Sequence, residues 1–207
     1  MKSSFYFLLF TRSFSGEIKV QTDEQAASLE SQKKSFVDFE LKLQCLETTN
    51  YSGVLVWKIT EFRRRLAEAK QGNRASVYSQ PFFTSRYGYR MCARLYLNGD
   101  GLGANHYVSF FFVIMKGEYD DVLTWPFKQK VTLKLLGHNP NKQREIKDGF
   151  KPDPSSSSFQ KPTSLMNLAT GCPRFISHQE LLREDSDFLK DDTIFFKIIV
   201  DISDLPT

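Results

Sequence analysis

The sequence predicts an all-β domain, an antiparallel β-sandwich, preceded by an α-helical coiled-coil segment. Three observations support this. From residue 51 onward, short apolar or alternating runs follow one another, turn signals separate them, and no long helical pattern lies between them. Before residue 51 the apolar spacing is helical instead. A chain of 207 residues with 41% hydrophobic and 25% charged residues suits one such domain plus an extension.

The helical spacing covers residues 29–50 and has the a/d pattern of a coiled coil. The expected stalk residues are Leu29, Phe36, Phe39, Leu43 and Leu46. Gln32 interrupts this seam, and only about three heptads are present, so an amphipathic helix packed on its own domain is the alternative. Residues 1–28 are expected to form a ragged or disordered N-terminus. Their apolar run at 5–10 is short and lacks a signal-peptide cleavage site.

Six segments after residue 51 are predicted to be strands. The first is followed by a short helix, which Thr60 is expected to cap and Gly72 to end. Segment 107–115 is almost wholly apolar, as in a central strand, and segment 130–136 alternates, as in a strand with one wet face. The expected strands are 54–59, 78–83, 89–97, 107–115, 130–136 and 193–202.

The strand at 89–97 and the turn after it carry the most informative side chains. One face of this strand is apolar, whereas the other presents Arg94 and Tyr96, and Asp100 follows in a turn where Asn-Gly and Asp-Gly supply positive φ. Further along, a row of serine hydroxyls stands beside Phe159. A guanidinium, a phenol and several hydroxyls on a rigid scaffold can grip a short acidic peptide through charge-assisted hydrogen bonds.

Other classes of function are disfavoured. A net charge of +4 is too balanced for a nucleic-acid binder, and no stretch is long enough to span a bilayer. Three widely spaced cysteines without a C-x-x-C pair argue against a disulfide framework and a zinc site, and favour a reducing, cytoplasmic location. No histidine has a partner at ligand spacing, so we expect no metal site and no cofactor. Cys172 and His178 match no nucleophile motif, which leaves no catalytic residue to name.

Five motifs resemble the TRAF domain, the C-terminal MATH-type module of the tumour-necrosis-factor-receptor-associated factors. They are YSGVLVWKI at 51–59, YGYRMCARLYLNGDG at 87–101, WPFKQKVTL at 125–133, FKPDP at 150–154 and KDDTIF at 190–195. The resemblance implies an eight-stranded antiparallel sandwich over residues 51–207, carried as a homotrimer on a three-helix stalk. It also implies a signalling adaptor. Members recognise Pro-x-Gln-Glu-type segments in the cytoplasmic tails of TNF-receptor-family receptors and in signalling adaptors, by adding a strand to a sheet edge.

The resemblance also assigns roles to individual residues. Arg94 and Tyr96 would hold the acidic side chain of the peptide, with Asp100 at the same edge. The hydroxyls that would clasp the peptide glutamine belong to Ser156, Ser157 and Ser158. The rings that would line a small apolar pocket belong to Phe111, Phe150 and Phe159. Close approach of the peptide backbone would involve Ala169, Thr170 and Gly171, where Thr170 replaces the serine usual in the family.

Family members that conjugate ubiquitin carry a RING domain and zinc fingers at the N-terminus, and this sequence shows neither. The resemblance therefore implies no enzymatic activity of the chain by itself. Two alternatives stay open: a MATH domain that recognises substrates for a ubiquitin ligase or deubiquitinase, and the detached C-terminal part of a RING-containing ligase.

Overall fold

The computed structural model describes residues 49–73, 75–139, 141–142 and 144–205, together with Gln25, Ser28, Leu29 and Gln32, which are helical. Leu29 is thus the one described residue among the five named for the predicted stalk. The other four, Phe36, Phe39, Leu43 and Leu46, lie outside the described residues. The coiled coil and the trimer therefore stay predictions. Residues 49–207 belong to one compact unit, which contains every described strand.

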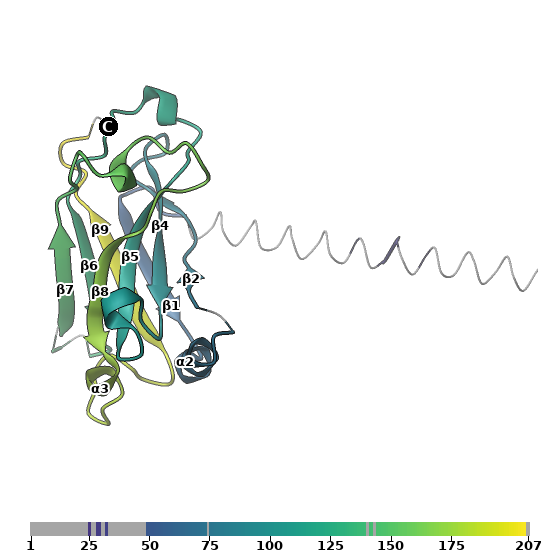
Figure 1. Cartoon of the computed structure of the whole chain (residues 1–207), viewed down its shortest axis with the longest axis vertical. Helices are drawn as coiled ribbons and strands as arrows, with labels where there is room; N and C mark the ends of the chain where they lie inside the picture. The colour runs from purple at the N-terminus through teal and green to yellow at the C-terminus, as the bar shows by residue number, and fades with distance from the viewer. Residues whose placement is uncertain are drawn as a thin grey trace, which may run out of the picture. The chain divides into compact units, whose positions relative to one another are not determined.

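Two antiparallel sheets form this unit, with strand orders β1-β9-β6-β7 and β2-β4-β5-β8 (Figure 1). The strands are β1 (Val54–Ile59), β2 (Val77–Tyr78), β3 (Phe82–Phe83), β4 (Arg90–Tyr96), β5 (Tyr107–Met115), β6 (Val131–Leu136), β7 (Glu145–Phe150), β8 (Thr170–Ser177) and β9 (Ile194–Val200). The helices are α2 (Phe62–Lys70) and α3 (His178–Leu181), with 3-10 turns η1 (Gly101–Gly103), η2 (Asp120–Val122) and η3 (Ser157–Phe159). Because β2 and β3 both pair with β4, they are two pieces of one edge strand, and the predicted eight-stranded sandwich is confirmed.

Aromatic side chains between the sheets hold the sandwich together. Phe110 of β5 lies 4.9 Å from Phe196 of the opposite sheet and 5.2 Å from Phe175 of its own sheet, measured between ring centroids. All three rings are buried. Each buried ring removes a large apolar area from water and adds edge-to-face contacts, so these phenylalanines fix how the two sheets pack.

The six predicted strands are present; 54–59 and 107–115 have their predicted bounds, and the others have shifted ends. Segment 78–83 is broken in two around Pro81, which has no N–H to donate to a ladder. Two strands, β7 and β8, were not predicted. β7 is polar and has an exposed or half-buried side chain at every position, while β8 contains Gly171 and Pro173, which normally signal a turn. Tertiary pairing with β5 and β6 overrides these weak local preferences.

The expectation that Thr60 caps the first helix is wrong. Helix α2 begins after Glu61, whose side chain makes no capping hydrogen bond. The cap instead comes from far along the chain. The carbonyl of Asp192 accepts from the N–H of Phe62 at 3.1 Å, and its carboxylate accepts from the N–H of Arg63 at 2.9 Å. The start of α2 is therefore fixed by the turn before β9.

Candidate functional site

The outward face of β4, β5 and β8 carries the side chains that the sequence singles out. Arg94 of β4 pairs in register with Phe111 of β5, which pairs with Gly171 of β8. Strands in a sheet lie about 4.8 Å apart, so these residues form one row across three strands. Three predicted site residues from distant parts of the sequence are thereby brought side by side.

Arg94 is held in place by three neighbours. Its Nε donates to the Ser76 hydroxyl at 3.1 Å, and its guanidinium carbon lies 5.0 Å from the ring centre of Tyr78 and 4.6 Å from that of Tyr96. Tyr96 in turn meets Phe111 edge-on, with ring centroids 5.8 Å apart. Burial raises the pKa of Tyr96, so its phenol keeps its proton and can donate a hydrogen bond.

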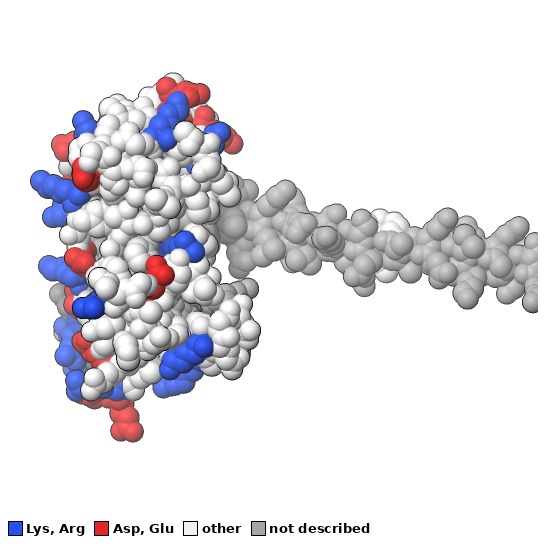
Figure 2. All heavy atoms as spheres, viewed as in Figure 1, with Lys and Arg blue, Asp and Glu red and all other residues white. Residues whose placement is uncertain are grey.

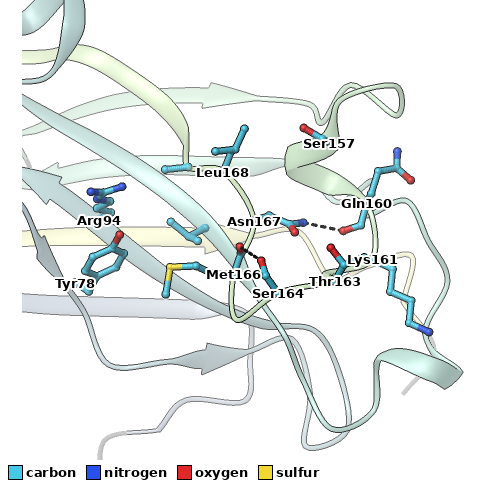
Figure 3. Close-up of a pocket in the computed structure, with 12 residues that line it drawn as sticks. Tyr78, Arg94, Ser157, Gln160, Lys161, Thr163, Ser164, Met166, Asn167 and Leu168 are labelled. Atoms are coloured by element: carbon cyan, nitrogen blue, oxygen red, sulfur yellow. Dashed lines mark hydrogen bonds between the residues drawn. The ribbon is translucent and has the colours of Figure 1, made fainter.

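A hollow of about 500 Å³ opens on this face beside Arg94 (Figure 3). Its walls come from β2, β4, β5 and η3, and from the chain between η3 and β8. The lining residues are Tyr78, Arg94, Val113, Ser157, Gln160, Lys161, Thr163, Ser164, Met166, Asn167, Leu168 and Ala169. Three of the predicted site residues, Arg94, Ser157 and Ala169, thus share one cavity.

The three serines have different environments. Ser157 is exposed and lines the hollow. Ser156 accepts from the N–H of Ser158 at 3.3 Å and so caps η3, while Ser158 is buried. Asn167 ties this loop to its neighbour, because its side-chain amide donates to the carbonyls of Ser158 at 3.1 Å and Gln160 at 2.7 Å. One hydroxyl of the predicted set therefore faces the cavity directly.

The three rings predicted to line an apolar pocket have different ring neighbours. Phe111 contacts Tyr96, whereas Phe150 and Phe159 contact each other at 6.0 Å, with Phe159 buried in the main core. At Gly171, an added Cβ would lie 2.3 Å from the carbonyl oxygen of Phe110, so the close approach that the structure shows there is that of β5.

The remaining predicted residues flank this row. Asp100 is exposed, and its negative charge adds to the effect of burial in raising the pKa of Tyr96. Thr170 is half-buried and pairs with Phe112 of β5. Gly99 and Gly101 have φ of 76° and 50°, which confirms the predicted positive φ in the turn. The turn places Asp100 at the end of β4, beyond Tyr96.

The geometry does not favour a thiol nucleophile. Burial and a hydrogen bond from the thiol to Asp148 raise the pKa of Cys172, which disfavours the reactive thiolate. The Nε2 atom of His178 lies 2.7 Å from the carbonyl oxygen of Leu97. Within the described residues, no group of three or more His, Cys, Asp or Glu side chains is arranged to hold a metal ion.

Charged side chains are interspersed rather than gathered. Arg64 pairs with Glu61 at 2.7 Å and Glu68 at 2.6 Å, and Arg63 lies 3.7 Å from Asp192, so the run of arginines on α2 is a solvated face with local partners. Lysines and arginines occur with acidic residues along the side where β7 lies, and the face seen in Figure 2 is largely uncharged. Among the described residues, no helix is both long and apolar enough to cross a bilayer.

Several residues of the hollow were missed by sequence reasoning. Tyr78 falls in a predicted strand, but only its pairing with Arg94 places it in the site. Met166, Asn167 and Leu168 lie in a stretch without periodicity, and no pattern distinguishes them from an ordinary loop. Identifying these residues requires the register in which neighbouring strands pair, and a single sequence does not contain it.

Comparison with known proteins supports the sandwich fold described above. The family model described as TRAF/meprin, MATH domain matches residues 74–197 of this chain. The chain belongs to the TRAF family. Its TRAF domain is similar to a solved structure of TRAF5 from Notothenia coriiceps, with a TM-score of 0.85, 34% identity, and coverage of 95% of this chain and 96% of that one.

Full-length relatives are also similar. TNF receptor-associated factor 5 of Mus musculus is 48% identical over 185 residues, which is 89% of this chain and 33% of that protein. TNF receptor-associated factor 2 of Homo sapiens is 46% identical over 187 residues, 90% of this chain and 36% of that protein. The chain thus spans about a third of the length of these relatives. Two motifs, 78–82 and 117–120, resemble TNF receptor-associated factor 3 or a close relative, and that narrower resemblance stays a prediction.

Proposed function

We propose that this chain acts as a signalling adaptor that binds short acidic segments in the cytoplasmic tails of TNF-receptor-family receptors and in signalling adaptors. The observation that carries the proposal is the fixed orientation of the Arg94 guanidinium at the hollow. The guanidinium is oriented by Ser76, Tyr78 and Tyr96, and it lines a hollow shared with Ser157. A cation fixed in this way binds a carboxylate with little loss of side-chain freedom.

The sheet edge beside the hollow supports binding by strand addition. β8 is the last strand in its sheet order, and the chain before it, through Ala169, lines the hollow. An edge strand offers backbone donors and acceptors to an extended peptide, while nearby side chains supply selectivity. In this arrangement Arg94 and Tyr96 take the acidic side chain, and Ser157 takes the glutamine amide through its hydroxyl.

Homotrimers formed through residues 29–50 would complete this function. A short peptide buries little surface and loses freedom on binding, so each groove binds weakly. Three grooves that meet a clustered receptor gain avidity, which makes recruitment depend on clustering. The protein would then be cytoplasmic, drawn to receptor tails at the membrane, and would carry out no catalysis itself.

Calorimetric titration of the full chain with a Pro-x-Gln-Glu peptide and its Pro-x-Gln-Gln counterpart tests the proposal. We expect the glutamate peptide to bind about tenfold more tightly or better, because only it gains a charge-assisted hydrogen bond from Arg94. Equal affinity for the two peptides, or binding of neither, would rule out the acidic-peptide groove. Multi-angle light scattering of the same chain tests the trimer.

One observation favours a second candidate. The relatives are about three times as long as this chain, so its TRAF domain also fits the substrate-recognition part of a ubiquitin ligase or deubiquitinase, or the detached C-terminal part of a RING-containing ligase. A monomer in light scattering at micromolar concentration would shift the balance toward the substrate-recognition alternative.

A further inference from the structure

Besides the main core, a second and smaller apolar cluster lies under the hollow. Cys92, Val113 and Met115 are buried there on the outward face of β4 and β5, with Met166 and Ala169 packed over them. Met166 and Ala169 are half-buried and line the hollow, and Leu168 beside them is 72% exposed. The hollow therefore has an apolar wall that the acid-binding and glutamine-binding side chains do not use.

This apolar wall is held firmly. The loop that carries it is attached to β5 and the residue after it by two backbone hydrogen bonds, from the N–H of Lys116 to Leu165 O and from the N–H of Asn167 to Ile114 O, both 2.9 Å. Met166 also forms an isolated antiparallel bridge with Met115. The exposed leucine is thus presented from a fixed backbone.

The register of the strands fixes how far this wall lies from Arg94. Arg94 pairs with Phe111, and Cys92 pairs with Val113, so the cluster lies two residues further along the same face. Two residues of extended chain span about 6.8 Å, and alternate side chains of a strand point to the same side. A peptide running along these strands with its acidic side chain at Arg94 places a second side chain over Met166 and Ala169.

Peptide direction follows from the sheet. Every strand pairing in the described residues is antiparallel. A strand added antiparallel to β8 runs from the level of Gly171 toward Ala169 and Leu168. The residue that reaches the apolar wall is then the second one after the acidic residue.

We infer that the hollow contains a specificity subsite, formed by Met166, Leu168 and Ala169, for an aliphatic side chain two residues after the acidic residue of the bound segment. This inference rests on the proposed function and extends the ligand class to an acidic-x-aliphatic segment. The occupant belongs to the same peptide, because Arg94 and the apolar wall line one continuous cavity (Figure 3).

The test titrates the full chain with two peptides, Pro-x-Gln-Glu-x-Leu and Pro-x-Gln-Glu-x-Ser. Wild type is expected to bind the leucine peptide about fivefold more tightly, since roughly half of the burial of a leucine side chain is available at an open wall. Leu168→Ser is expected to remove most of this preference, so that the two peptides bind with similar affinity. A second variant, Met166→Ser, should act in the same direction.

Leu165→Ser is the matched control. Leu165 is 66% exposed and belongs to the same loop, but it does not line the hollow, so this variant should keep the fivefold preference. If wild type binds both peptides equally while Arg94→Ala weakens both, the subsite is wrong and the proposed groove stands. If neither peptide binds, or Arg94→Ala changes nothing, the proposed function fails with it.

Discussion

Replacement of Arg94 tests the site at a side chain that its neighbours hold in place. The guanidinium is already oriented by one hydrogen bond and two aromatic rings, so its removal takes away a ready-made donor rather than a mobile one. Hydrogen bonds to a charged group contribute about 1.5–3 kcal/mol. Arg94 is half-buried, so we take about 2 kcal/mol for Arg94→Ala, which weakens acidic-peptide binding about 30-fold.

Arg94→Lys separates charge from shape. Lysine keeps the positive charge but loses the planar fork and the stacking between Tyr78 and Tyr96. We expect a loss of about 1 kcal/mol, or about fivefold, between wild type and Arg94→Ala. Calorimetry with the Pro-x-Gln-Glu peptide measures both variants. Raising the salt concentration should weaken wild-type binding more than that of Arg94→Ala.

Arg63→Ala is the control for net charge. Arg63 is on α2 with 67% of its side chain exposed, and it does not line the hollow, so this variant should bind like wild type. A thermal melt guards against misfolding, since Arg94→Ala should lower Tm by only about 2–4 °C through the lost ring contacts. Affinity of Arg94→Ala within twofold of wild type would refute the reasoning.

Three further outcomes concern the fold that supports the site. Asp192→Ala removes the acceptor for the N–H of Arg63, so urea denaturation should show a loss of about 1 kcal/mol, with less loss for Asp192→Asn, which keeps an acceptor. Ser109→Ala removes the hydroxyl that accepts from the N–H of Asp100 and donates to the carbonyl of Pro173 in β8. The same assay should show that the free energy of unfolding falls by about 1–3 kcal/mol, and unchanged stability would contradict this role. Burial raises the pKa of Cys92 to about 12, so iodoacetamide at about pH 8 should label its thiol only in denaturant. Peptide mass spectrometry measures the labelling, and rapid labelling of the native chain would show that the thiol is accessible.

Local pattern was enough to predict the strands that face both core and solvent. In β4 the alternation of apolar and polar residues placed Met91, Ala93 and Leu95 inward and left Arg94 and Tyr96 outward, as the structure shows. The resemblance supplied the eight-stranded sandwich. β7, which is mostly polar, and β8, which contains glycine and proline, were not predicted, because pairing with neighbouring strands rather than local sequence makes them strands.

The cavity itself was beyond a single sequence. The run at 107–115 is apolar at almost every position, so nothing in it says that Phe110 faces the core while Val113 lies under the hollow. Periodicity assigns a strand to a face only when one face is polar. Which serine reaches the cavity depends in the same way on the turn at η3, where Ser156 is used as a cap and Ser157 is left free to face a ligand.

The orientation of Arg94 also bears on why assembly would matter. A preoriented guanidinium lowers the entropy lost on binding, but it cannot enlarge the small surface that a four- to six-residue peptide buries. The affinity of one groove is therefore limited by contact area rather than by disorder in the site. Additional affinity must come either from a further peptide side chain that packs against the wall at Leu168, or from several grooves acting together. The first route discriminates between peptides, and the second discriminates between dispersed and clustered receptors.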